Sequence, residues 1–176
     1  MRLFHTFLLI LPPCRGRHQR FSELYLETTI PSYLTARRSR DLRLAADQET
    51  TEEWWETKRH EYELFTSEVV EVEAAEGDAA MAEARLRALD GIPRLPAQPE
   101  VDELIEHLLG SQIIPANAAP DAAHIAFSAV HAMDFLLTWN CKHINNPHLV
   151  RRIERACAER GLACPVICTP EELLPL

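Results

Sequence analysis

The stretch FLLTW at residues 135–139 decides the fold class, because it is almost wholly apolar over five consecutive positions. A strand covered on one face alternates apolar and polar residues, whereas a continuous apolar run is typical of a parallel strand buried on both faces. Residues 120–133 and 147–160 flank this stretch, and both begin with proline, which is favoured in the first turn of a helix. A buried strand between two helices predicts an α/β fold.

The rest of the chain repeats this alternation. Short strands are expected at residues 24–26, 62–66, 92–95 and 165–169, the third weakened by Pro93 and therefore at an edge of the sheet. Further helices are expected at residues 39–61, 78–89, 99–109 and 170–174. Pro31 opens another helical region, and one more helix is expected to run from its N-cap at Ser67 to Gly77. Strands separated by helices imply a mostly parallel sheet covered on both faces, and ligands of such folds bind at the carboxyl ends of the strands.

The charge of the chain is unevenly distributed. Its 176 residues fit one domain, and 18 basic against 27 acidic side chains give a net charge of −9. That total argues against a protein that coats nucleic acid. However, residues 1–40 carry seven basic and two acidic side chains, whereas residues 41–83 carry three basic and fourteen acidic ones. The negative charge belongs mostly to one segment, so the total does not exclude RNA.

Residues 1–22 are interpreted as an extension outside a domain of residues 23–176, such as upstream sequence from an early start codon. Residues 3–11 resemble a signal-peptide core, but they fall short of the ~20 apolar residues that span a bilayer, and no small-x-small cleavage site follows. The five cysteines lack paired spacing, which is typical of a reducing compartment. We therefore expect a cytoplasmic protein without a membrane partner.

A zinc site is the alternative interpretation of the cysteines. It would gather Cys141, His143, Cys157, Cys164 and Cys168, but no CxxC or HxxxH spacing is present. Burial as small apolar side chains explains these cysteines better.

Four polar residues fall at the expected carboxyl ends of strands or on the helices beside them: Glu27, Glu73, Asp121 and Asn140. Carboxylates that converge at one edge of a sheet repel unless a cation neutralises them, and oxygen ligands favour Mg²⁺ or Mn²⁺. Each residue also has an ordinary explanation. Asp121 complements a helix dipole, Glu73 is one acid among many, and Asn140 suits a turn. Spacing alone therefore leaves the metal site open.

Five motifs, in the same order along the chain, resemble those of the PIN-domain nucleases. They are LYLETTIPS (24–32), TSEVVEVE (66–73), DAAHIA (121–126), LLTWNCKHI (136–144) and VICTPEELL (166–174). The resemblance implies a PIN-like three-layer α/β/α sandwich, Mg²⁺-dependent ribonuclease activity and a relationship to the VapC-like toxins of type II toxin–antitoxin pairs. Two positions depart from the family: Glu27 replaces the usual Asp, and Asn140 stands where many members have Asp.

The resemblance nominates catalytic residues for hydrolysis of an RNA phosphodiester. Glu27, Glu73 and Asp121 would hold the metal, and Asn140 would orient a ligand water. Thr29 would support either Glu27 or the scissile phosphate. His124 lies one helical turn after Asp121. His124 therefore either reaches the metal site itself, or lies in the core or beside the metal ligands without binding the metal.

Basic residues are the candidates for contact with the RNA backbone. Arg37, Arg38 and Lys142 flank the expected site, whereas the helix at residues 147–160 adds four arginines. Among the four, Arg155 and Arg160 are expected on a solvated face.

The acidic segment at residues 41–83 would meet a basic antitoxin that inserts an arginine among the carboxylates. Trp54 and Trp55 suit either the core or a homodimer contact. The alternative to a nuclease is a catalytically weak or silent PIN-like protein that acts as a binding module. Asn140 and the negative charge favour that alternative.

Overall fold

The computed structural model describes residues 21–175, and four strands in this range form one parallel sheet. The strands are β1 (Ser22–Leu26), β2 (Tyr62–Phe65), β3 (Phe135–Leu137) and β4 (Val166–Cys168). Their order across the sheet is β2-β1-β3-β4, with Leu24 opposite both Leu64 and Phe135. The predicted α/β class and parallel sheet are confirmed.

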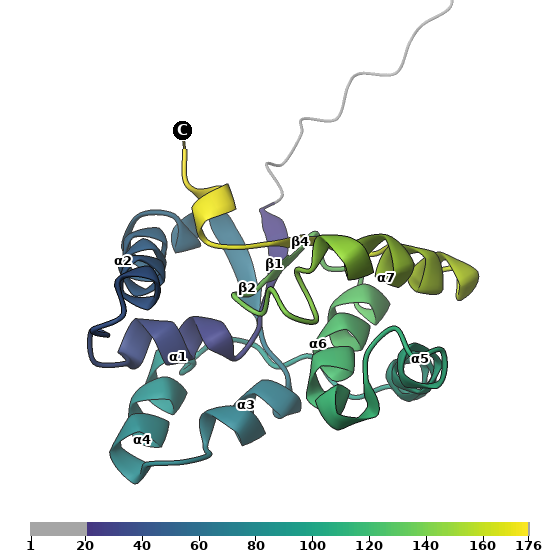
Figure 1. The fold of residues 1–176 in the computed structure, drawn as a ribbon, viewed down its shortest axis with the longest axis horizontal. Coiled ribbons are helices and arrows are strands. Elements are labelled where there is room, and N and C mark those ends of the chain that lie inside the picture. Colours follow the sequence, from purple (N-terminus) through teal and green to yellow (C-terminus); the bar gives the residue numbers. More distant parts are fainter. Residues whose placement is uncertain (1–20, 176) are drawn as a thin grey trace, which may run out of the picture.

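Seven α-helices within the described residues cover the sheet. They are α1 (Thr29–Thr35), α2 (Leu42–Thr57), α3 (Glu68–Ala74), α4 (Ala79–Ala88), α5 (Pro99–Gly110), α6 (Ala119–Val130) and α7 (Pro147–Glu159). Figure 1 shows α1, α2 and α4 on one side of the sheet and α5, α6 and α7 on the other. The fold is therefore a three-layer α/β/α sandwich.

The core lies on both faces of the central strands. Leu24, Tyr25 and Leu26 of β1 are fully buried, as are Leu136 and Leu137 of β3. This burial explains the continuous apolar run at residues 135–139, because Leu136, Leu137 and Thr138 are buried while Phe135 and Trp139 are partly buried at its ends. Helix α6 is buried from Ala122 to Ala129, and its first turn reaches the carboxyl end of the sheet.

The strand expected at residues 92–95 is wrong, because the structure forms only an isolated parallel bridge between Thr66 and Arg94 there. The amide of Thr66 donates to the carbonyl of Pro93 at 3.0 Å, and the amide of Leu95 donates to the carbonyl of Thr66 at 2.8 Å. Proline has no amide hydrogen, so Pro93 cannot extend the ladder. The edge position is nevertheless the one expected.

The polar helix expected at residues 39–61 is shorter than predicted. It begins at Leu42, because the side chain of Asp41 accepts hydrogen bonds from the amides of Arg43 and Leu44. It ends at Thr57, and a 3₁₀ turn at Arg59–Glu61 completes the segment.

Strand β1 begins at Ser22, so the last residue of the predicted extension belongs to the first strand. Residues 1–20 of that extension lie outside the described residues. Between residues 21 and 175, no helix has both the length and the apolar character needed to cross a membrane.

The cysteines and tryptophans lie mainly in or beside the core. Cys157 and Cys168 are buried, while Cys141 is exposed. Trp54 is fully buried, and the half-buried ring of Trp55 lies 4.7 Å beneath the guanidinium group of Arg59.

Candidate metal centre

Glu27 is a buried carboxylate at the carboxyl end of β1, with only 4% of its surface exposed. One oxygen, Oε2, accepts hydrogen bonds from the amide and hydroxyl of Thr29 and from the hydroxyl of Thr138 at 2.8 Å. The other oxygen, Oε1, has no hydrogen bond from the described residues and lies 3.9 Å from Nε2 of His124. The protein therefore anchors one oxygen and leaves the other available.

Glu73 reaches the same place from α3. Its Oε2 accepts a hydrogen bond from the hydroxyl of Thr28 and lies 2.9 Å from Nε2 of His124. Burial alone would raise the pKa of Glu73, but the hydrogen bond and positive charge of His124, together with the Thr28 hydroxyl, outweigh burial and lower this pKa. Glu73 is therefore held as a carboxylate.

His124 is fully buried on α6 and connects Glu73 to a chain of hydroxyl groups. Its Nδ1 lies 3.0 Å from the hydroxyl of Tyr25, which lies 2.6 Å from the hydroxyl of Ser67. Burial raises the pKa of Tyr25 far above its ordinary value, so Tyr25 keeps its proton. Ser67 begins α3 at the predicted cap position, but its hydroxyl bonds Tyr25 and makes no capping hydrogen bond.

This hydroxyl chain is compatible with either proton arrangement of His124, because tyrosine and serine hydroxyls both donate and accept. In one arrangement Nε2–H donates to Glu73 and Nδ1 accepts from Tyr25. In the other, Nδ1–H donates to Tyr25, and the lone pair of Nε2 faces the carboxylates. Metal-bound histidines commonly donate a hydrogen bond from the second ring nitrogen, so the second arrangement suits a ligand.

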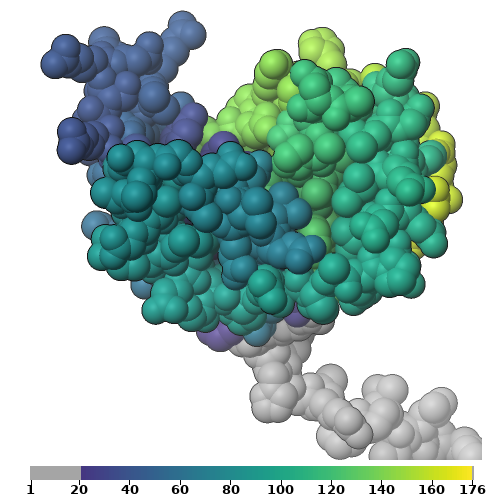
Figure 2. All heavy atoms as spheres, turned by 90° about the horizontal axis from the view of Figure 1, so that it is seen from below, coloured from purple at the N-terminus to yellow at the C-terminus, as the bar shows by residue number. Residues whose placement is uncertain are grey.

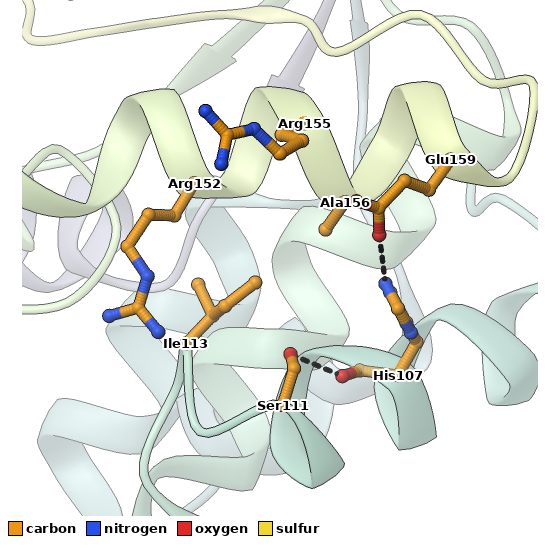
Figure 3. A pocket seen from close by; sticks show the side chains of 7 residues that line it. All are labelled: His107, Ser111, Ile113, Arg152, Arg155, Ala156 and Glu159. Atoms are coloured by element: carbon orange, nitrogen blue, oxygen red, sulfur yellow. Dashed lines mark hydrogen bonds and ion pairs between the residues drawn. The ribbon is translucent and has the colours of Figure 1, made fainter.

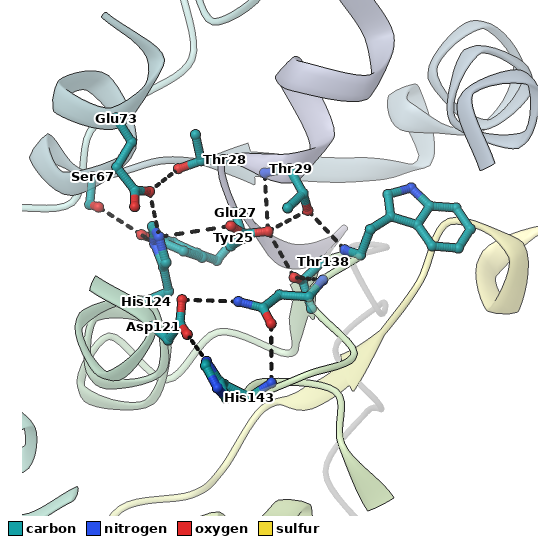
Figure 4. A network of polar contacts seen from close by, with 12 residues as sticks. Tyr25, Glu27, Thr28, Thr29, Ser67, Glu73, Asp121, His124, Thr138 and His143 are labelled. Carbon is teal, nitrogen blue, oxygen red and sulfur yellow. Dashed lines mark hydrogen bonds and ion pairs between the residues drawn. The ribbon is translucent and has the colours of Figure 1, made fainter. Parts of the chain in front are cut away.

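Glu27, Glu73 and His124 form a compact donor set (Figure 4). Each offers one ligand atom, and the three atoms all lie within 4.8 Å of one another. Two carboxylates this close in a partly buried site repel, and either a protonated His124 or a metal ion would balance them. Carboxylate oxygens suit Mg²⁺ and Mn²⁺, while imidazole also suits softer transition metals. The donor set therefore fits a divalent ion.

Asp121 lies in the first turn of α6, beside this set but not in it. Its Oδ1 accepts a hydrogen bond from Nδ2 of Asn140 at 2.9 Å, and its Oδ2 lies 2.6 Å from Nδ1 of His143. The carbonyl oxygen of the Asn140 side chain accepts from the backbone amide of His143 at 3.1 Å. These contacts orient Asp121, and each of its oxygens keeps a lone pair for a further partner.

Thr138 connects the two halves of the site. Its hydroxyl donates to Glu27 and accepts from the backbone amide of Asn140 at 2.8 Å. The hydroxyl of Thr29 adds a second link, because it accepts from the backbone amide of Trp139 at 2.8 Å. The ends of β1 and β3 are thus joined through side chains as well as through the sheet.

The sequence did not predict the contacts that several residues make in the site, above all Thr138, His143 and the Tyr25–Ser67 pair. Thr138 and His143 both lie in the motif that contains Asn140, and Tyr25 lies two residues before Glu27 on β1. Their positions in or beside the motifs were the signal in the sequence that they belong to the site. Nothing in the spacing indicated which side chains they would contact.

The predicted phosphate-binding residues have varied surroundings. The hydroxyl of Thr29 supports Glu27, which is one of its two predicted roles. Arg38 is exposed but directed to α2, where it donates to the carbonyl of Ala45 at 2.9 Å and pairs with Glu52 at 3.1 Å. Arg37 and Lys142 are exposed.

The surface is hollowed close to the segments that carry the site. Figure 2 shows a notch between the blue lobe of α2 and the light green segment that begins α7, with purple residues of the α1 region at its base. Helix α1 follows Glu27 directly, and the segment before α7 carries Asn140 and His143. Comparison with protein-family models and with curated proteins finds no match to this chain.

Proposed function

We propose that this protein is a divalent-metal-dependent endoribonuclease, similar to the PIN-domain nucleases of the VapC-like kind. The observation that carries the proposal is Glu27, a buried carboxylate with one oxygen anchored by three donors and the other directed toward Glu73 and His124. Burial of a charged group is costly, and this arrangement keeps one oxygen ready for a cation.

Glu27 and Glu73 would hold the Mg²⁺ or Mn²⁺ ion, with either His124 or Asp121 as a further ligand. When bound, such an ion supplies positive charge to a phosphoryl oxygen and lowers the pKa of water. The protein's own contribution is positioning. Thr29 and Thr138 hold Glu27 in place, and similar contacts hold Glu73 and Asp121, so the oxygens do not have to reorganise when RNA binds. Asn140 acts on Asp121, and its role toward a ligand water stays a prediction.

The test is cleavage of single-stranded RNA by purified protein in Mg²⁺ or Mn²⁺, with EDTA as the metal-free control. We expect Glu27→Gln to lower the rate by at least about 100-fold, because the amide removes the charge that holds the ion. Asp121→Asn is expected to lower the rate as well. Glu63→Gln is the matched control, since Glu63 is an exposed glutamate on β2. Equal rates for the wild type, Glu27→Gln and Asp121→Asn would assign the activity to a contaminant or another site.

A second candidate function is that of a catalytically weak or silent PIN-like binding module. It is favoured by the contact between His124 and Glu73, which balances the carboxylates without a metal, and by Asn140 at the position where many PIN domains have an acid. Stabilisation of the wild type by Mn²⁺ without any RNA cleavage would support this candidate.

The toxin assignment adds two proposed protein partners. A basic antitoxin would bind the acidic segment at residues 41–83 and place an arginine among the carboxylates. A homodimer is the second, and Trp55, half-buried on α2, is available for its interface. Sedimentation of the purified chain tests whether it forms a dimer. The proposed function also includes a cytoplasmic location.

A further inference from the structure

Helix α7 carries a row of basic side chains on one face. His148, Arg151, Arg152 and Arg155 follow the spacing i, i+3, i+4, i+7, so they share a face of the helix, and all four are exposed. We call these four residues the α7 basic face. The chain as a whole has a net charge of −9, so this face is opposite in sign to the molecule as a whole.

The α7 basic face lacks acidic partners. Among the described residues, Arg151 and Arg155 make no ion pair, and Arg152 contacts only the carbonyl of Gln112, at 3.3 Å. Several exposed arginines elsewhere do pair with carboxylates, as Arg94 does with Glu71 at 2.9 Å. Unpaired guanidinium groups are free to bind an anion from outside the chain.

A hollow between α7 and the end of α5 adds shape to this charge (Figure 3). Its volume is about 160 Å³, and it is lined by His107, Ser111, Ile113, Arg152, Arg155, Ala156 and Glu159. The one acid, Glu159, already contacts His107 at 3.1 Å, and the Ser111 hydroxyl donates to the His107 carbonyl at 2.6 Å. The free donors are therefore those of Arg152 and Arg155. Guanidinium groups match phosphate oxygens in geometry, and the volume admits one phosphate group.

The start of α7 lies beside the loop that carries part of the candidate metal centre. The side chain of Asn146 accepts from the amide of His148 at 2.9 Å and donates to the carbonyl of Lys142 at 2.8 Å. It thereby joins the helix to the loop that carries His143. With a rise of about 1.5 Å per residue, Arg152 and Arg155 lie about 8 and 12 Å along the axis from Pro147. A nucleic-acid strand that leaves the metal centre along α7 reaches both arginines.

We infer that the α7 basic face binds the RNA backbone beyond the cleaved bond, with one phosphate in the hollow between α7 and α5. The inference rests on the proposed ribonuclease function for the identity of the polyanion. The inference assigns Arg155 to phosphate binding, whereas the sequence placed it on a solvated helix face. Arg160 is excluded, because it pairs with Glu103 at 3.2 Å.

The first experiment measures binding of a fluorescent single-stranded RNA of about ten nucleotides, with Ca²⁺ in place of Mg²⁺ and intact RNA verified by gel. We expect Arg152→Gln/Arg155→Gln to weaken binding about tenfold at low salt. The slope of log affinity against log salt concentration should fall by about 0.7 for each lost phosphate contact. Arg160→Gln, which removes one positive charge at the C-cap of the same helix, should leave that slope unchanged. Equal losses in Arg160→Gln and the double variant would overturn the inference.

The second experiment separates this inference from the proposed function through substrate length. A dinucleotide has a single phosphodiester and cannot also fill the hollow, so the double variant should cleave it at the wild-type rate while cleaving the longer RNA more slowly. Wild-type cleavage of both substrates by the variant, together with wild-type binding, would overturn the inference alone. Binding that depends on Arg152 and Arg155 without any cleavage would overturn the proposed function alone.

A competing occupant of the α7 basic face is the acidic segment of a second copy of the chain. In that case the double variant would abolish self-association in sedimentation experiments while RNA binding stayed at the wild-type level. That result would overturn the inference in favour of a dimer interface.

Discussion

Thr138 holds the two halves of the candidate metal centre together with one hydroxyl group. It is fully buried, it donates to Glu27, and it accepts from the amide of Asn140. A hydrogen bond to a charged group contributes more to stability than one between neutral groups, and a buried carboxylate that loses a donor is costly. The position of Glu27 therefore depends on a residue from another strand.

Thr138→Val tests this dependence, because valine has a similar shape but no hydroxyl. We expect the free energy of unfolding to fall by about 1–3 kcal/mol, since Glu27 loses a donor and the Asn140 amide loses its acceptor. Thr138→Ser keeps the hydroxyl and should lose less. Urea unfolding measures both variants, and equal stabilities would mean that the hydroxyl contributes nothing.

Tyr25 determines what His124 can do, because its hydroxyl is the partner of Nδ1. If His124 binds the metal through Nε2, Tyr25→Phe removes the group that orients the ring, and Mn²⁺ affinity should fall by about 10–100-fold. Tyr62→Phe is the control, since the Tyr62 hydroxyl has no hydrogen bond among the described residues. Unchanged Mn²⁺ affinity in Tyr25→Phe, measured by calorimetry, would restrict His124 to its contact with Glu73.

At the scale of elements, the junction before α7 is held by Asn146. Its side chain caps the helix through the amide of His148 and binds the carbonyl of Lys142, so it determines how α7 leaves the site. We expect Asn146→Ala to lower the free energy of unfolding by about 1 kcal/mol. Asn145→Ala, at the neighbouring position outside the cap, should have a smaller effect in the same urea titration. The opposite ranking would contradict the capping role.

Helix α6 places Asp121 and His124 one turn apart, and the two side chains have different surroundings. Asp121 is in the first turn, mostly buried and in contact with His143 of the loop before α7, whereas His124 is fully buried against Tyr25. Residues three apart on a helix share a face. The helix therefore brings both to the same end of the sheet, and the surrounding strands decide which of them meets Glu27 and Glu73.

At the scale of the whole molecule, the net charge of −9 opposes binding of a polyanion. Occupation of the metal centre adds two positive charges beside Glu27 and Glu73. We therefore expect RNA binding by the wild type to strengthen when a divalent ion replaces EDTA. Fluorescence anisotropy at constant ionic strength measures this effect, and equal affinities in both buffers would contradict it.

Metal binding should also stabilise the fold. An ion that binds only the native state adds about 2.7 kcal/mol at a concentration 100 times its dissociation constant. We expect Mn²⁺ to raise the midpoint of thermal unfolding of the wild type and of Glu63→Gln, and EDTA to reverse the increase. Glu27→Gln should show no increase. A rise of the same size in Glu27→Gln would place the ion elsewhere.

Much of the architecture follows from local patterns in the sequence. Apolar runs predict the buried strands, and prolines and capping residues predict where the helices begin, because these signals report burial and backbone geometry within a few residues. The same patterns place Glu27 and Asn140 after strands and Asp121 at a helix start. The strand expected at residues 92–95 shows the limit, since an apolar pattern does not reveal that Pro93 reduces pairing to one bridge.

The sequence by itself therefore determined the α/β class, the parallel sheet and the edge at which the polar residues gather. Only the tertiary structure decided that His124 rather than Asp121 completes the close group with Glu27 and Glu73, and that Asp121 pairs with His143. The physical reason is distance along the chain. Glu27 and Thr138 are 111 residues apart, and their contact depends on strand register and side-chain rotamers that no local pattern encodes.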